Sequence, residues 1–306
     1  MKAAAAFFSE ASNLKIDPKR FRVPKGREVS LDRWPTAIRP FYKAQAHYKE
    51  LLDADVARLS ALQRLLYASN EYSLLLVFQG MDSAGKDGAI SHLLTGVNPQ
   101  GCEVHSFKHP GPEELEHDFL WRAMCVLPGR GRIGVFNRSY YEEVLVARVH
   151  PEILRSEGVA GRRAGDRKVW KERFESIVKL EQHLHRNGTR VIKFFLHLSK
   201  AEQRKRLLER IDDPEKNWKY NQADLVERGL WNRYMRAYEE CLGATSTKIA
   251  PWHVVPADDK YNARLIVSRV VIDTLQGLGM AYPKLTREQR NGLRAIRRQL
   301  SGSGRR

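Results

Sequence analysis

The chain has 306 residues, of which 42% are hydrophobic, and this length can bury the core of one large domain. No apolar run approaches the roughly 18 residues that span a bilayer, and the start MKAAAAFFSEASN has too short an apolar segment for a secretory signal. We therefore expect a cytoplasmic protein with no membrane partner. The three cysteines are far apart and form no CxxC pair, which favours neither a disulfide framework nor a zinc site.

Charge narrows the class of partner. The sequence has 53 basic and 36 acidic side chains, a formal net charge of +17 that is spread through the chain. A field of this sign attracts polyanions, and charge alone leaves nucleic acid open as one of them. The sequence contains no helix-turn-helix signature, zinc finger or RNP aromatic motif to support that alternative.

Residues 1–35 carry Pro, Gly and alternating charge without sustained periodicity, so we expect an N-terminal extension that lies over the domain surface. From about 40 to 70, apolar residues recur every three or four positions, which predicts a pair of helices or one long helix. Apolar or β-branched runs then alternate with helical patterns, at 73–79, 102–107, 133–137, 190–198 and 252–256. This alternation predicts βαβ units and a parallel sheet.

The second half of the chain has two clear helical segments and a basic end. Residues 168–186 place apolar side chains on one stripe, and Asn-Gly at 187–188 ends that helix before a strand. Residues 200–210 form a densely basic helix. We expect one α/β catalytic domain over 36–283, followed by a basic C-terminal tail at 284–306.

The stretch GMDSAGKDG at 80–88 follows the apolar run SLLLVFQ and nearly spells the phosphate-binding loop GxxxxGK[ST]. Gly80, Gly85 and Lys86 match, while Asp87 replaces the hydroxyl residue that normally helps to hold Mg²⁺. A buried strand, a glycine-rich turn and a helix start together present backbone N–H groups to a phosphate. The loop, including Ser83 and Ala84, is therefore a candidate phosphate site in which Lys86 reaches the phosphoryl group.

Asp82 lies inside this loop, where a carboxylate would repel bound phosphates unless a divalent cation sits between them. Asp82 is therefore a candidate metal ligand. The alternative is a loop acid that only caps the following helix. That alternative fits Asp87 better than Asp82, because Asp87 lies in the first helical turn.

A second constellation is GRIGVFNRSYYEEVLVARVH at 131–150. Nucleoside-triphosphate enzymes use an acid at the end of a buried strand to handle the metal, and Asn137 takes that place here. Arg138 follows, with a planar fork that suits phosphoryl oxygens. Glu142 or Glu143 could restore the missing carboxylate, or both could simply stabilise a helix N-terminus.

Four segments in order, GMDSAGKDGAI, SFKHPGPEELEHDFLWR (106–122), GVFNRSYYEEVLVARVHPEIL and RIDDPEKNWKYNQADL (210–225), resemble the family-2 polyphosphate kinases. The resemblance is to the subgroup that acts on both nucleoside mono- and diphosphates, and it runs from about residue 20 to about 283. It implies a P-loop kinase-like, three-layer α/β/α sandwich with a five-stranded parallel sheet and a helical lid at about 200–228. It also implies inorganic polyphosphate as the phosphoryl donor.

Several residues match the family's motifs one by one. The resemblance implies that Asp82 binds Mg²⁺, that Lys86 steadies the transferred phosphoryl, and that Asn137 and Arg138 form the second motif. Relatives that prefer diphosphates have D-R-S where this chain has N-R-S. Glu142 falls where the subgroup with monophosphate activity has an acid, and with Asp82 it is the expected metal-ligand set.

The remaining matches surround the expected substrate channel and the lid. Lys108 and Arg122 fall at family positions near the channel. In the lid, Arg206 and Arg210 share a helix face, and Lys216 and Lys219 flank Trp218; such a patch can close on phosphates and exclude water. The alternative for any one of these arginines is a solvated basic helix.

The resemblance implies reversible, Mg²⁺-dependent transfer of the terminal phosphoryl of polyphosphate to ADP or AMP, with guanine nucleotides as further acceptors. It implies one or two Mg²⁺, with Mn²⁺ as a possible substitute, and a homodimer or homotetramer; nucleic acid is not an expected partner. Two alternatives stay open: an ATP-dependent small-molecule kinase, and a basic P-loop protein that binds nucleic acid. The phosphoryl donor that supports turnover discriminates the first alternative, and tight, salt-sensitive DNA or RNA binding without phosphoryl transfer discriminates the second.

Overall fold

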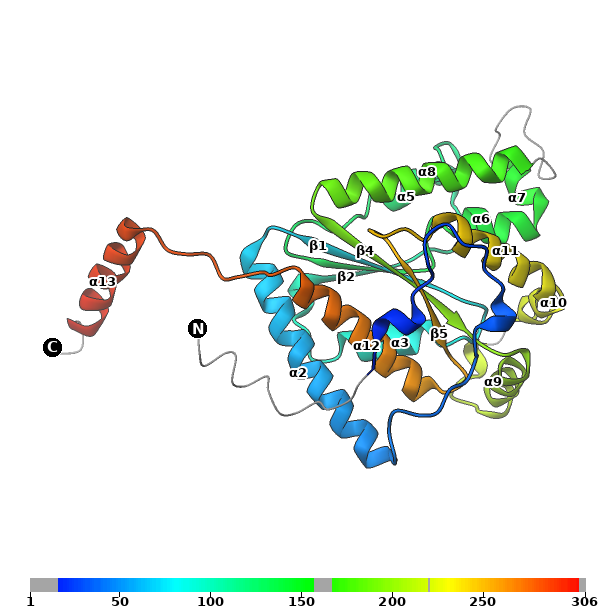
Figure 1. Cartoon of the computed structure of the whole chain (residues 1–306), viewed down its shortest axis with the longest axis horizontal. Coiled ribbons are helices and arrows are strands. Elements are labelled where there is room, and N and C mark those ends of the chain that lie inside the picture. Colours follow the sequence, from blue (N-terminus) through cyan, green and yellow to red (C-terminus); the bar gives the residue numbers. More distant parts are fainter. Residues whose placement is uncertain (1–15, 157–166, 220, 303–306) are drawn as a thin grey trace.

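Residues 16–156, 167–219 and 221–302 are described in the computed structural model of the chain (Figure 1), except for the side chain of Lys219. The predicted N-terminal extension and basic tail therefore lie partly outside the described residues. Over the described part, no helix is both long enough and apolar enough to cross a membrane.

The described strands form one parallel sheet in the order β2-β3-β1-β4-β5. All seven residues of β1 are buried, as expected for a central strand covered on both faces. The sheet confirms the predicted α/β class, and each strand lies within one residue of its predicted range. The strands are β1 (Ser73–Gln79), β2 (Cys102–Ser106), β3 (Ile133–Asn137), β4 (Thr189–His197) and β5 (Trp252–Pro256).

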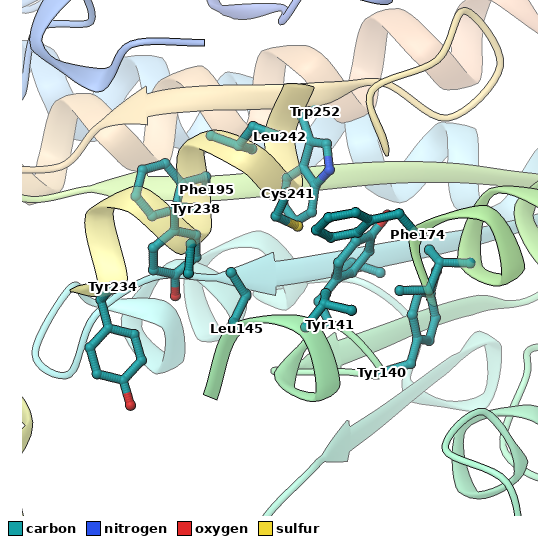
Figure 2. Close-up of a cluster of buried hydrophobic side chains, with 14 of the residues drawn as sticks. Tyr140, Tyr141, Leu145, Phe174, Phe195, Tyr234, Tyr238, Cys241, Leu242 and Trp252 are labelled. Atoms are coloured by element: carbon teal, nitrogen blue, oxygen red, sulfur yellow. The ribbon is translucent and has the colours of Figure 1, made fainter. Parts of the chain in front are cut away.

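Helices cover both faces of the sheet and give three layers (Figure 1). One face carries α2 (Gln45–Ser69), α3 (Lys86–Leu94) and α12 (Lys260–Gly277), whose buried side chains form one core cluster with the even-numbered side of β1. The other face carries α6 (Glu142–Val149), α8 (Arg167–Arg186) and α11 (Trp231–Thr245). That second cluster is rich in aromatic side chains, and Figure 2 shows Tyr141, Phe174 and Trp252 together in it.

Residues 45–69 form one long helix, which decides between the two predicted arrangements. Its buried positions Leu51, Leu59 and Leu66 recur at helical spacing and belong to the same core cluster as the buried side chains of α12. The helix ends at Asn70, whose φ of 52° is the left-handed conformation that commonly stops a helix.

Residues 16–35 are more deeply packed than an extension over the surface would be. Phe21, Val23 and Leu31 are buried in the core, and the Val23 amide donates to the carbonyl of Trp252 in β5 at 2.9 Å. The segment thus covers the edge of the sheet beside β5. It includes the 3₁₀ helices η1 (Pro18–Phe21) and η2 (Leu31–Arg33).

Two further parts of the structure are the predicted lid and a helix near the C-terminal end. The predicted lid consists of α9 (Lys200–Asp212), η4 (Asn217–Lys219) and α10 (Ala223–Gly229). Helix α13 (Arg287–Gly302) stands away from the body of the protein (Figure 1). The other elements are η3 (Pro99–Gly101), α4 (Pro112–Leu115), α5 (Trp121–Met124) and α7 (Pro151–Ser156).

Candidate active site

The phosphate-loop motif lies between β1 and α3, at the carboxyl end of the central strand. From β1 the chain passes to the edge strand β2 and returns to β3, whereas β4 lies on the other side of β1. Ligands of open α/β sheets bind in the crevice at such a switch point. A cavity of about 790 Å³ lies there, and residues 82–87 of the loop line it.

The loop backbone requires glycine at two of the motif positions. Gly80 has a φ of 156°, and a Cβ there would lie 3.0 Å from the carbonyl oxygen of Leu196 and 3.1 Å from the Cβ of Ala84. Gly85, at the start of α3, has a φ of 97°, which side chains rarely adopt. These two glycines let the loop turn tightly over the end of β4 and direct the α3 N-terminus at the cavity.

Lys86 is nearly buried and is held by the loop itself. Its Nζ donates to the carbonyls of Gly80 at 2.7 Å and Met81 at 3.3 Å. Burial, and next the charge of Arg138, lower the pKa of Lys86. Two of the three ammonium donors thus fix the side chain in the loop, where it lines the cavity.

Arg138 bridges the two acids that the sequence predicts as metal ligands. Its guanidinium donates to Asp82 Oδ1 at 2.8 Å and to Glu142 Oε2 at 3.0 Å. Glu142, and after it Asp82, raises the pKa of Arg138 further above its ordinary value. The three side chains come from the loop after β1, the end of β3 and the start of α6, and all three line the cavity.

Asn137 and Asp87 are joined directly. The Asn137 amide donates to Asp87 Oδ1 at 2.7 Å, so the residue at the end of β3 contacts the one that replaces the loop hydroxyl. The carboxylate expected at the strand end and the hydroxyl expected in the loop are thus exchanged for an amide and a carboxylate. Both residues line the cavity.

Lys108 and Arg122 lie on the β2 side of the cavity. Arg122 donates to the carbonyl of Lys108 and to Glu143 Oε1, both at 2.8 Å, and the side chains of Arg122 and Glu143 are each 7% exposed. Arg122 is therefore a buried brace between the β2 loop and α6 that also lines the cavity. Glu143 is engaged in this pair, which leaves Glu142 as the acid beside Asp82.

The lid residues differ in what they contact. Arg206 donates to the carbonyls of Ser83, Ala84, Ala257 and Asp258 at 2.7–3.2 Å, so most of its donors go to backbone. Arg210 pairs with Asp224 of α10 at 3.1 Å. Arg206, Arg210 and Lys216 line the cavity. Lys219 ends η4, and its side chain lies outside the described part of the structure.

One wall of the cavity is apolar, which the sequence analysis did not predict. Phe107, Val146 and Ile153 lie in it, together with Pro110. The signal was present in EEVLVARV, where apolar side chains occupy more of α6 than one core-facing stripe needs. The cavity thus combines a cationic floor with an apolar wall.

The donor set suits a hard divalent cation. Mg²⁺ is usually held by one or two carboxylates together with waters and substrate phosphates, and not by an all-protein cage. Asp82 and Glu142 supply two carboxylates that already share one cationic partner. Among the described residues no group of three or more His, Cys, Asp or Glu side chains could hold a metal ion.

A parallel sheet in this order, with a glycine loop and lysine at its switch point, defines a P-loop kinase-like α/β protein. The sequence model of one family, Polyphosphate kinase 2 (PPK2), matches residues 42–281. The chain belongs to that family.

The chain is also similar in sequence to named proteins over nearly its whole length. It is 60% identical to an ADP-polyphosphate phosphotransferase of Rhodopseudomonas palustris, over 94% of this chain and 99% of the relative. It is 42% identical to an AMP/ADP-polyphosphate phosphotransferase of Meiothermus ruber, over 87% and 96%. The crystal structure of Polyphosphate Kinase 2 from Arthrobacter aurescens TC1 superimposes with a TM-score of 0.83 and 40% identity, covering 94% of this chain and 99% of that one.

Proposed function

We propose that this protein is a Mg²⁺-dependent polyphosphate:nucleotide phosphotransferase, which transfers the terminal phosphoryl of inorganic polyphosphate to ADP and AMP. Guanine nucleotides are further acceptors on this proposal, and Mn²⁺ is a substitute for Mg²⁺. The names of the two relatives support polyphosphate as donor and adenine nucleotides as acceptors. A homodimer or homotetramer stays a prediction.

The observation that carries the proposal is the Asp82–Arg138–Glu142 bridge beside Lys86, in a cavity that also has an apolar wall. Phosphoryl transfer needs positioning and neutralisation of charge more than covalent chemistry. Lys86 and Arg138 supply fixed positive charge, and the apolar wall suits a nucleoside. Basic groups on both sides of the loop suit a donor that is itself a chain of phosphates.

Asp82 and Glu142 would hold the divalent cation, which when bound neutralises charge on donor and acceptor oxygens. Arg138, which lines the same cavity, has a planar fork that would suit phosphoryl oxygens of the substrates. Lys86 keeps two donors on the loop carbonyls and directs the third at the transferred group. The acceptor oxygen of AMP or ADP is already anionic, so no strong general base is required.

The first test is product formation by the purified protein with Mg²⁺ and polyphosphate, given AMP or ADP as separate acceptors. Wild type should form ADP from AMP and ATP from ADP. Lys86→Met and Asp82→Asn preserve side-chain size and should each lower kcat by about 100-fold or more, because the first removes a positive charge beside the transferred group and the second weakens the proposed metal site.

Matched changes on α2, at residues that do not line the cavity, serve as the control. Lys49→Met and Asp53→Asn alter exposed side chains of α2 and should leave kcat unchanged. No product from either acceptor with polyphosphate, combined with turnover when ATP is the donor, would overturn the proposal in favour of an ATP-dependent small-molecule kinase. Tight, salt-sensitive RNA or DNA binding without phosphoryl transfer would overturn it in favour of a nucleic-acid-binding protein.

A further inference from the structure

The turn that carries Arg138 has an unfavourable backbone conformation. Arg138 has a φ of 64°, in the left-handed region of backbone conformations. A residue with a long side chain adopts this conformation only when its surroundings impose it. On one side the turn is held by hydrogen bonds to β1: the Arg138 amide donates to the carbonyl of Phe78, and Gln79 Nε2 donates to Ser139 Oγ. The other side of the turn must be held by the residues that follow.

Two consecutive tyrosines follow the turn, and both donate to one carboxylate oxygen. The hydroxyls of Tyr140 and Tyr141 lie 3.1 and 2.8 Å from Glu181 Oε1 of α8. All three side chains are buried, and burial raises the pKa of both phenols well above the ordinary value, so they stay protonated and donate. Figure 2 shows both rings inside the aromatic cluster.

Lys193 of β4 completes the arrangement and is fully buried. Its Nζ donates to Glu181 Oε2 at 2.7 Å, to the Tyr141 hydroxyl at 2.9 Å and to the carbonyl of Thr245 at 2.8 Å. These three acceptors use all three donors of the ammonium group. The network therefore ties the turn after β3 to β4, α8 and α11.

Stability alone does not account for such a network. A buried ion pair is expensive to desolvate, and apolar residues of similar volume often stabilise a fold equally well or better. A fully satisfied polar network, in contrast, specifies a single arrangement of the groups that it joins. Tyr141 directly precedes Glu142 and lies three residues after Arg138, so its position sets where those two side chains enter the cavity.

We propose that Glu181 and Lys193 are positioning residues for phosphoryl transfer, which hold Arg138 and Glu142 in place through the hydroxyls of Tyr140 and Tyr141. Neither Glu181 nor Lys193 is among the described residues that line the cavity, so both act from behind the turn. The role in transfer rests on the proposed function. The effect on the geometry of the turn does not depend on it.

The main test is the double variant Glu181→Met and Lys193→Met, which removes both charges and keeps the side-chain volume. We expect a lower melting temperature, because the buried hydroxyls of Tyr140 and Tyr141 and the carbonyl of Thr245 lose their partners. At a temperature where the variant is fully folded, kcat should be at least tenfold lower, because small displacements of reacting groups are costly. KM for the nucleotide should stay within about threefold, since the apolar wall is unchanged. A merely structural network predicts instead a wild-type kcat wherever the variant is fully folded.

Two milder variants keep the test decisive if the double variant does not fold. Tyr141→Phe removes one hydroxyl and leaves the ring, and it should lower kcat in the same direction with KM unchanged. Tyr140→Phe, whose hydroxyl contacts Glu181 but not Lys193, should have a smaller effect. Wild-type kcat in both variants would overturn the proposal.

A second buried ion pair supplies the matched control. Arg269 of α12 and Asp55 of α2 lie 3.1 Å apart, with side chains 11% and 2% exposed, on the other face of the sheet. The double variant Asp55→Leu and Arg269→Met removes a comparable pair and should leave kcat unchanged. A loss of kcat equal to that of the Glu181 and Lys193 variant would show that any lost ion pair has this effect, and would overturn the proposal.

A crystal structure of the Glu181→Met and Lys193→Met variant separates this proposal from the proposed function. We expect Arg138 to leave the left-handed region or to lose its bridge to Asp82 and Glu142. An unchanged turn would overturn the positioning role, whatever the donor of the phosphoryl group. Conversely, a wild-type protein that does not use polyphosphate would refute the proposed function, while this structure would still decide what the network does to the turn.

Discussion

Arg138 serves two carboxylates that would otherwise repel each other. Asp82 enters the cavity from the loop after β1 and Glu142 from the start of α6, and the guanidinium between them donates to both. Its left-handed backbone conformation brings the fork to this position. The arginine thus occupies the place where two carboxylates attract a cation most strongly, and on the proposed function a metal ion would compete with it for them.

This competition predicts opposite effects of Arg138→Gln on metal binding and on turnover. Mn²⁺ affinity without phosphates should rise by about tenfold, the equivalent of one charge-assisted hydrogen bond that no longer competes. The kcat should fall by about 10²–10³, because a donor aimed at the phosphoryl oxygens is lost. Electron paramagnetic resonance of free Mn²⁺ and initial rates measure the two effects.

A control for this variant is Arg148→Gln, which breaks an ion pair with Glu240 away from the cavity. It should change neither quantity. Weaker Mn²⁺ binding by Arg138→Gln would mean that the arginine does not compete with the metal for the two carboxylates.

His253 of β5 makes the stability of the fold depend on pH. Burial, and next the charge of Arg22, lower the pKa of His253 to about 3. In the unfolded chain the histidine takes up a proton near pH 6.5, whereas in the folded chain it stays neutral until about pH 3. The free energy of unfolding therefore falls as the pH falls from about 6.5 towards 3. Between pH 7.5 and pH 5 this histidine should cost about 2 kcal/mol of unfolding free energy.

The measurement is urea unfolding at pH 7.5 and pH 5 for wild type and His253→Gln. The glutamine does not titrate, so the variant should lose about 2 kcal/mol less than wild type over this interval. Only the difference between the two pH values enters, and the absolute stability of the variant does not. Equal losses would mean that His253 is protonated in the folded protein at pH 5.

At the scale of elements, α9 is attached to the phosphate loop through Arg206. The guanidinium of Arg206 joins carbonyls of the loop to carbonyls that follow β5. Gln203, one turn earlier, donates to the carbonyl of Asp82 at 2.9 Å. The first half of the predicted lid is therefore fixed to the loop.

These backbone contacts predict that lysine cannot replace Arg206. Arg206→Met should lower the unfolding free energy by about 2–3 kcal/mol, because buried carbonyls lose charged donors. Arg206→Lys should restore little, since an ammonium group cannot reach two pairs of carbonyls as a planar fork does. Thermal unfolding and kcat of both variants test these effects. Arg204→Met, which changes an exposed arginine on the same helix, is the control. Recovery of kcat by lysine would instead favour an electrostatic clamp.

Elements could be predicted from the sequence because each depends on local patterns. The buried run SLLLVFQ and the loop after it appear in the structure as a strand, a turn and a helix start. The bridge through Arg138 could not be predicted in the same way. Asp82 and Arg138 are 56 positions apart, and the left-handed turn that joins them is held by Glu181 and Lys193 from two further elements.

Arg206 shows the same limit. Its spacing from Arg210 on one helix face predicts a patch open to phosphates, but spacing does not show which donors the backbone of another loop will take. The same holds for the N-terminal segment. Its Pro and Gly content indicates irregular structure, while the burial of Val23 depends on the edge of β5, distant in sequence, that the segment covers.

At the scale of the whole molecule, a large part of the positive charge lies outside the packed core. Residues 284–306 contain eight basic side chains and one acidic one, which is +7 of the total of +17. Residues 281–301 are exposed throughout, and α13 stands apart from the body (Figure 1). The family match ends at residue 281. The tail therefore adds to the electrostatic field without adding to the described core.

Deletion of residues 284–306 should leave the melting temperature and kcat unchanged, because no buried side chain is removed from the described core. KM for long polyphosphate should rise, and its dependence on ionic strength should weaken, since a smaller positive field attracts the polyanion less. KM for AMP and ADP should not change. The matched variant is the full chain with the five arginines of α13 changed to glutamine, which should reproduce the higher KM if charge is the cause. A lower melting temperature on deletion would show instead that the tail packs against the body.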